Sequence, residues 1–305
     1  MGKTKLIVVA GPTASGKTAL AARLAKEING EVISADSMQV YKDMRIATAA
    51  PSKAEMLGVP HHMVEVIDRD TPFSAADFCT QARALISDIV SRGRVPVIAG
   101  GTGLFIDSLV NNVRFIETQS DPQLREKLMA KDTDALYAEL LEADQEAAQK
   151  IHKNNKKRVA RALEIYYLTG KTKTQADLEA VSADTPYETL YFVIEFQNRQ
   201  ALYERIDRRV DLMLRNGLAE EARRCLADGG RTAAQAIGHK ELLPYFEGSI
   251  SLEEAAENIK RETRRYAKRQ ITWFKRRADA VRLTADGNTD IVRTAVKLSR
   301  DFLNG

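Results

Sequence analysis

The sequence predicts an α/β fold, in which helices flank a parallel β-sheet, together with a helical insertion domain and a helical C-terminal region. Three observations lead to this prediction. Short apolar runs alternate with helical patterns over the first hundred residues, which is typical of βαβ units. A stretch with helical spacing, rich in Ala, Leu, Glu and Lys, then fills residues 121–170. One further apolar run at 189–194 precedes a mostly helical remainder.

Size and composition are those of an ordinary globular protein. The chain has 305 residues, of which 44% are hydrophobic, enough to bury a substantial core. No apolar run approaches the roughly 20 residues of a membrane span, so we expect a cytoplasmic protein without membrane contact. The two cysteines, Cys79 and Cys225, lie too far apart for a disulfide framework or a C-x-x-C metal site.

The first predicted elements are a strand, a phosphate-binding loop and a helix, at about residues 5–29. The loop matches the pattern G-x-x-x-x-G-K-[ST] between a buried strand and a helix, which is the context that the pattern requires. Backbone N–H groups and the helix dipole converge on phosphate oxygens in such a loop. We therefore predict a P-loop NTPase-like core. The loop residues are Gly11, Pro12, Thr13, Ala14, Ser15, Gly16, Lys17 and Thr18.

Two side chains of this loop carry its ionic chemistry. Lys17 is expected to contact the outer phosphate, and the Thr18 hydroxyl is expected to bind a Mg²⁺ ion that bridges phosphate oxygens. The loop alone does not distinguish a diphosphate leaving group from the end of a nucleoside triphosphate such as ATP.

Further strands are predicted at 31–35, 62–67 and 94–99, with a helix from a capping box at Ser74 to about residue 92. Ligands gather at the carboxyl ends of parallel strands. The phosphate loop, residues 36–39 and residues 100–103 are therefore expected to meet at one crevice. Asp36 then binds magnesium, accepts a proton or caps a turn, and these alternatives stay open.

The chain is expected to divide into three parts. Asp121 and Pro122 begin a helical insertion, which includes a helix near 155–169. The strand at 189–194 returns the chain to the sheet, and helices follow at 200–215, 218–228 and 251–275. We expect a catalytic core at 1–115, an insertion that contacts RNA at 116–188, and a C-terminal part of the core at 189–305.

Basic residues concentrate in two segments. Residues 258–282 carry ten positive and two negative charges, and a smaller cluster lies at 153–161. A solvated helix face is the common explanation for such a run. Here Tyr266, Gln270, Trp273 and Phe274 are interleaved with the charges, and they add groups that stack or form hydrogen bonds, which favours nucleic acid.

Seven segments, in order along the chain, together resemble the bacterial tRNA dimethylallyltransferases of the tRNA isopentenyltransferase family. They are the phosphate loop and residues 36–41, 60–62, 100–104, 161–164, 235–238 and 266–274. The set is far more specific than the phosphate loop alone. Three places depart from the family pattern: Lys157 stands where glutamine is frequent, His239 where tyrosine is frequent, and residues 46–51 lack a common glycine and lysine.

The resemblance implies transfer of a dimethylallyl group from its diphosphate to the exocyclic amine of the adenosine 3′ to the anticodon, without ATP. It makes Asp36 the general base, Lys17 a catalytic cation and Thr102 a polar group near both substrates. Arg205 and Arg209 are expected to bind the diphosphate, although a solvated helix face also explains them. The expected partners are dimethylallyl diphosphate, Mg²⁺ and the anticodon stem-loop of tRNA, bound by a monomer.

The resemblance and the basic helix together also predict the RNA contacts. These are Asp36, Ser37, Met38, Gln39, Lys157, Arg158, Val159, Ala160, Arg161, Gln235, Ala236, Ile237, Gly238, His239, Lys240, Arg264, Arg265, Lys268 and Arg269.

Two other classes of function compete with this interpretation. A P-loop kinase acting on a small metabolite explains the sheet and the loop, but not the basic helix or the insertion. An RNA-binding nucleotide switch explains the basic helices, but it gives Asp36 and residues 100–103 no role.

Overall fold

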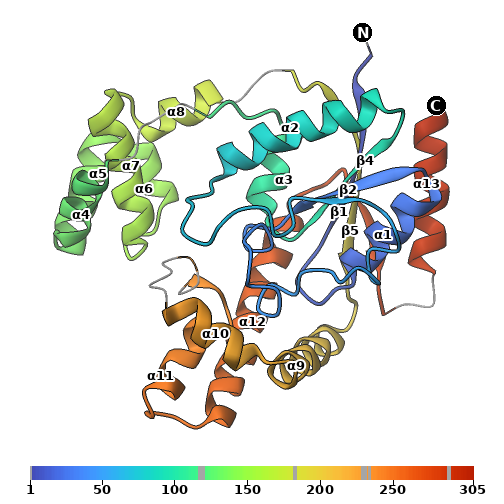
Figure 1. Cartoon of the computed structure of the whole chain (residues 1–305). Coiled ribbons are helices and arrows are strands. Elements are labelled where there is room, and N and C mark those ends of the chain that lie inside the picture. The colour runs from blue at the N-terminus through green and yellow to red at the C-terminus, as the bar shows by residue number, and fades with distance from the viewer. Residues whose placement is uncertain (1, 116–120, 181–183, 228–231, 233–234, 287–289) are drawn as a thin grey trace. The chain divides into compact units, whose positions relative to one another are not determined.

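The structure is a computed structural model that describes residues 2–115, 121–180, 184–227, 232, 235–286 and 290–305 (Figure 1). Within these residues one sheet contains six strands in the order β3-β2-β4-β1-β5-β6, and every neighbouring pair is parallel. The predicted parallel α/β fold is confirmed. The strands are β1 (Thr4–Ala10), β2 (Gly30–Ala35), β3 (His61–His62), β4 (Val95–Gly100), β5 (Tyr187–Glu195) and β6 (Val281–Thr284).

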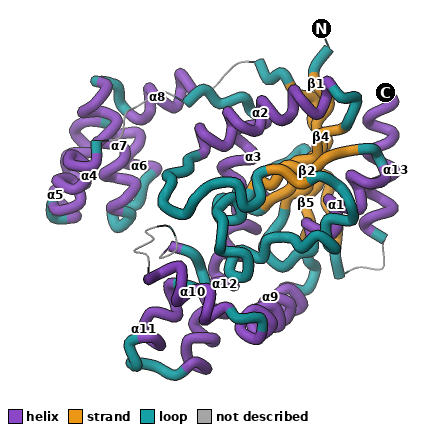
Figure 2. Tube along the Cα trace, viewed as in Figure 1, coloured by secondary structure: helices purple, strands orange, loops and turns teal. Residues whose placement is uncertain are grey.

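Helices cover both faces of this sheet (Figure 2). Leu6 and Val8 of β1 pack with α2 (Ala75–Ser91) and α3 (Gly103–Val110), whereas Ile7 and Val9 pack with α1 (Lys17–Glu27) and α13 (Ile291–Asn304). Successive side chains of a strand point to opposite faces, so residues 6–10 of β1 form an unbroken apolar run because both of its faces are buried there.

The predicted strand at 62–67 is wrong in extent, because β3 ends at His62. Met63 and Glu65 have φ angles of 61° and 53°, and this left-handed backbone ends the extended chain. Residues 65–67 instead form hydrogen bonds with residues 39 and 40. The sequence also failed to predict β6, whose short run buries only Leu283 fully.

The chain forms two compact units, one of residues 1–110 and 186–305 and the other of residues 111–185. The second unit is helical and has its own core, which includes Leu136, Leu140 and Leu163. The Arg114 N–H donates to the Ala180 carbonyl at 2.8 Å, so the two ends of this unit lie together. The expected boundary at residue 116 lies outside the described residues. The helices are α4 (Pro122–Ala130), α5 (Thr133–Ala143), α6 (Gln145–Lys150), α7 (Lys156–Thr169) and α8 (Lys173–Ala180).

The remaining helices belong to the C-terminal part of the first unit. The longest, α12, begins after the predicted capping box of Ser251 and Glu254 and packs against α9 through Ile206 and Ala267. Among the described residues, no helix has the length and apolarity that crossing a bilayer requires. These helices are α9 (Arg199–Arg215), α10 (Leu218–Ala227), the 3₁₀ turn η2 (Lys240–Leu242), α11 (Leu243–Phe246) and α12 (Leu252–Phe274).

Candidate functional site

The phosphate loop joins β1 to α1 with the geometry that an anion requires. Gly16 has a φ of 90°, which is unfavourable for other residues, and it precedes the N-terminus of α1 without a side-chain cap. The Ser15 hydroxyl is buried and has no hydrogen-bond partner among the described residues. Because buried polar groups are normally paired, the loop fits an anion that would supply the missing acceptors.

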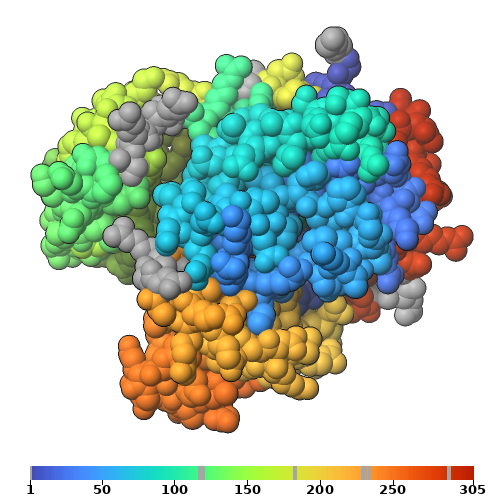
Figure 3. Space-filling view, in the orientation of Figure 1, coloured from blue at the N-terminus to red at the C-terminus, as the bar shows by residue number. Residues whose placement is uncertain are grey.

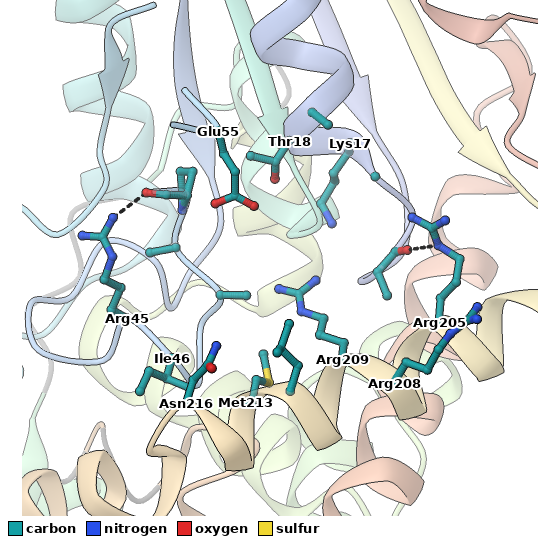
Figure 4. A pocket seen from close by; sticks show the side chains of 17 residues that line it. Lys17, Thr18, Arg45, Ile46, Glu55, Arg205, Arg208, Arg209, Met213 and Asn216 are labelled. Carbon is teal, nitrogen blue, oxygen red and sulfur yellow. Dashed lines mark hydrogen bonds between the residues drawn. The ribbon is translucent and has the colours of Figure 1, made fainter. Parts of the chain in front are cut away.

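A cavity of about 680 Å³ opens between the phosphate loop and α9, and we call it the donor cavity. Its walls carry several cations and one carboxylate, Glu55. The side chains of Lys17 and Arg209 point toward each other across it (Figure 4). The lining cations are Lys17, Arg45, Arg205, Arg208 and Arg209.

Burial perturbs the two facing cations. Desolvation lowers the pKa of Lys17 from 10.5 to about 8, although the negative charge of Asp36 opposes this change. Desolvation also lowers the pKa of Arg209, against the charges of Asp36 and Glu55. A bound diphosphate would offset the desolvation free energy of these buried cations, since it would bring negative charge close to both.

Arg205 has a second role beside lining the cavity. Its Nε donates to the Ala14 carbonyl at 2.9 Å, so α9 holds the backbone of the phosphate loop directly. Ala14 has a φ of 60°, a conformation that needs support from its surroundings. Arg205 therefore fixes the loop as well as adding charge to it.

A second cavity, of about 100 Å³, adjoins the first, and we call it the acceptor cavity. Asp36 and Tyr266 line it, and Arg209 and Met213 line both cavities. Asp36 Oδ1 accepts the N–H groups of Met38 at 2.9 Å and Gln39 at 3.3 Å. These two bonds fix the orientation of the carboxylate, which lines the acceptor cavity.

Residues 36–39 and 100–103 meet, as expected from the carboxyl ends of β2 and β4. Ala35 pairs with Gly100 in the sheet, and the Ser37 N–H donates to Thr102 Oγ1 at 3.0 Å. The Tyr266 hydroxyl also hydrogen-bonds with Thr102, and burial, more than the charge of Asp36, raises the pKa of Tyr266. Thr102 therefore joins the Asp36 turn to α12.

The helix α12 contributes to the site in a way that differs from the prediction. Gln270 is 5% exposed, and its amide accepts the Thr13 N–H at 2.8 Å and donates to the Gly101 carbonyl at 2.9 Å. Phe274 is buried in the sheet core. These two side chains are therefore not available to stack on RNA. The spacing of 266, 270 and 274 along one helix face was the signal that they face inward.

The predicted RNA contacts divide by exposure. Lys157, Arg158, Gln235, Lys240, Arg265, Lys268 and Arg269 are exposed. Five others are buried, and their contact with RNA stays a prediction: Val159, Ala160, Ala236, Gly238 and His239. Three of the arginines have acidic partners, since Arg161 pairs with Glu164 at 2.8 Å, Arg264 with Asp207 at 2.5 Å and Arg265 with Glu262 at 2.6 Å.

The residues present fit a magnesium ion only in part. Thr18 lines the donor cavity, where its hydroxyl reaches the space that phosphates would fill. The described residues contain no group of three or more His, Cys, Asp or Glu side chains suited to a metal. An ion here would take most of its ligands from phosphate oxygens and water, as Mg²⁺ commonly does.

Comparison with known proteins agrees with this geometry. A family model described as IPP transferase matches residues 39–277. The tRNA dimethylallyltransferase of Caldanaerobacter subterraneus subsp. tengcongensis is 46% identical over 279 residues, which cover 89% of each chain. That of Bacillus subtilis is 46% identical over 279 residues, covering 90% of this chain and 88% of the relative.

Solved structures show the same likeness. The tRNA isopentenylpyrophosphate transferase of Bacillus halodurans is 40% identical with a TM-score of 0.73, over 99% of this chain and 96% of the other. A eukaryotic dimethylallyltransferase described as acting on tRNA is 33% identical with a TM-score of 0.85, over 99% of this chain and 80% of the other. The family model matches well over half of the chain, and the relatives are 46% identical over at least 89% of it, so the chain belongs to the IPP transferase family.

Proposed function

We propose that the protein transfers a dimethylallyl group from dimethylallyl diphosphate to the exocyclic amine of the adenosine 3′ to the anticodon in tRNA, and releases diphosphate. The observation that carries this proposal is the pair of adjoining cavities. One has a phosphate loop and an excess of cations, the other has the Asp36 carboxylate, and Arg209 lines both. A dimethylallyl group that separates from diphosphate in the donor cavity would therefore lie close to an adenine amine bound in the acceptor cavity.

The donor cavity supplies stabilisation of the leaving group. An allylic carbon ionises readily because its positive charge is delocalised, so the main requirement is to stabilise the diphosphate and to exclude water. Lys17 and Arg209 provide positive charge from opposite walls, while Ser15 and the backbone N–H groups of the loop provide hydrogen bonds. Arg205 keeps that loop in the binding geometry.

Asp36 completes the transfer as a general base. The lone pair of an adenine amine is shared with the ring, so the amine attacks well only if a base takes its proton as the new C–N bond forms. The bonds from Met38 and Gln39 hold Asp36 Oδ1, which leaves Oδ2 to accept that proton. A stacked adenine cannot reach a partly buried carboxylate, so the base must flip out of the anticodon loop.

A magnesium ion bound through Thr18 and the diphosphate would add positive charge to the leaving group.

We further propose that RNA phosphates bind the exposed cations of α12, namely Arg265, Lys268 and Arg269. We also propose that the enzyme works in the cytoplasm as a monomer.

The test is to incubate the purified protein with unmodified tRNA and either dimethylallyl diphosphate or ATP, and to analyse the tRNA nucleosides by mass spectrometry. Dimethylallyl adenosine, formed with the prenyl donor alone, supports the proposal. Consumption of ATP without prenylated nucleoside would instead favour the kinase alternative, which the relatives do not support.

A further inference from the structure

A short turn forms part of the wall of both cavities. Ile46 and Ala49 line the donor cavity, and Ala47 and Thr48 line the acceptor cavity. We call residues 46–49 the partition turn. Its position sets how closely the two reactants approach, so a displacement of the turn would change the transfer geometry without removing any group that touches the reacting atoms.

A single buried carboxylate holds one side of the partition turn. Glu221 of α10 accepts the Ile46 N–H through Oε2 at 2.7 Å and the Ala47 N–H through Oε1 at 2.8 Å. Glu221 is 3% exposed, so these charge-assisted bonds form out of water. In the space-filling view the blue segment after β2 lies against the orange segment that carries α10 (Figure 3).

His239 completes the environment of this carboxylate. The ring is fully buried, and its Nε2 lies 3.0 Å from Glu221 Oε1, so Nε2 carries the hydrogen that is donated to the carboxylate. His239 thus faces Glu221, not solvent. This contact explains why a residue predicted to bind RNA is inside the protein.

The opposite side of the partition turn is held by Gln39. Its Nε2 donates to the carbonyls of Thr48 and Ala49, each at 3.2 Å, and its Oε1 accepts the Ser34 hydroxyl at 3.0 Å. Ala49 has a φ of 47°, which costs free energy and persists only where surrounding contacts enforce it. The Gln39 amide is therefore engaged within the protein.

We propose that Glu221 is a positioning residue, which together with His239 keeps the partition turn in the place that the prenyl transfer requires. The inference rests on the proposed function for its effect on catalysis. The hydrogen bonds from the partition turn to Glu221 belong to the folded chain, so their effect on the turn is measurable without substrates.

The experiment compares Glu221→Gln with Glu220→Gln, which removes the same charge from an exposed neighbour on α10. Hydrogen exchange of the peptide covering residues 44–50 is measured by mass spectrometry, followed by kcat and the KM of each substrate. A glutamine amide cannot accept both N–H groups, so this peptide should exchange faster in Glu221→Gln while peptides of β1 and β4 keep their protection. We expect kcat to fall by about 10- to 100-fold, and Glu220→Gln to match the wild type.

If Glu221→Gln leaves the exchange of residues 44–50 unchanged, Glu221 does not hold the partition turn. If exchange becomes faster but kcat and KM match the wild type, Glu221 has no role in positioning the reactants. A wild-type protein that forms no prenylated nucleoside would instead reject the proposed function, whatever the exchange data. If Glu221→Gln does not fold, His239→Leu and His239→Gln decide the matter. Only the glutamine retains a donor for Glu221, so it should restore slow exchange and kcat relative to the leucine, and equal behaviour of the two would refute the proposal.

Discussion

The titration of Lys17 gives a quantitative test of the donor site. Burial lowers the pKa of Lys17 to about 8 in the unliganded protein. A bound diphosphate adds negative charge beside the ammonium and should return its pKa toward the ordinary value of 10.5. Binding of the donor is therefore coupled to uptake of a proton at any pH at which Lys17 of the unliganded protein is deprotonated.

The magnitude follows from the difference between the two pKa values. A change from 10.5 to about 8 corresponds to about 3 kcal/mol of interaction that favours the neutral amine. Above pH ~8 the Kd of the donor should rise about tenfold per pH unit, reaching about 30-fold at pH ~9.5. The same group makes the unliganded protein more stable as pH rises from ~8 to ~10.5, because the unfolded chain then binds more protons.

The assay is isothermal titration calorimetry with dimethylallyl diphosphate, at pH values from ~7 to ~9.5 and in pairs of buffers that differ in ionisation enthalpy. Proton uptake should approach one per donor at the highest pH. The matched control is Lys17→Arg, whose guanidinium stays charged, so the pH dependence should disappear. A constant Kd and no proton uptake in the wild type would refute the coupling.

Three other predictions concern the base, the basic helix and the stability of the sheet. Asp36→Asn should lower the single-turnover rate by about 10²- to 10⁴-fold with little change in donor affinity, and recovery at high magnesium would assign Asp36 to metal binding instead. Replacing Lys268 and Arg269 of α12 by Ala should weaken tRNA binding and reduce the slope of log K against log salt by about one per lost phosphate contact, so an unchanged slope would place the RNA elsewhere. The Arg92 hydrogen bonds lower the pKa of buried Glu31 from 4.5 to about 2, so this carboxylate stabilises the fold above pH 4.5 and loses that effect as pH falls toward 2. Glu31→Gln should lower the free energy of unfolding by about 2 kcal/mol at neutral pH and flatten its acid dependence, and identical denaturation curves from pH ~2 to ~7 would contradict this.

The sequence was sufficient for those parts of the site that follow from local rules. The phosphate loop is contiguous, and Asp36 and Thr102 come directly after strands, so the topology of a parallel sheet brings them together. The contacts that hold these groups were not predictable in this way. Gln270 bonds to Thr13 across 257 positions and Glu221 to Ile46 across 175, and no local pattern relates such pairs.

Two errors have an identifiable physical cause. Residues 62–67 have the Val and Ile content of a strand, but left-handed conformations at Met63 and Glu65 interrupt the extended backbone. The second concerns α12, where aromatic residues interleaved with basic ones favour nucleic acid in the sequence. Helical periodicity separates the two sets, since Phe274 and Gln270 share the inner face while Lys268 and Arg269 lie on the outer one.

The order of the strands has a consequence for synthesis of the chain. β1, which carries the phosphate loop, lies between β4 and β5, yet β5 begins at Tyr187, after the whole 111–185 unit. While the ribosome makes that unit, one edge of β1 has no partner, although the unit has a separate core and is able to condense meanwhile. An unpaired apolar edge invites association with other chains. Completion of β5 covers this edge of β1, and the other edge of β5 is covered in turn only when β6 has been made.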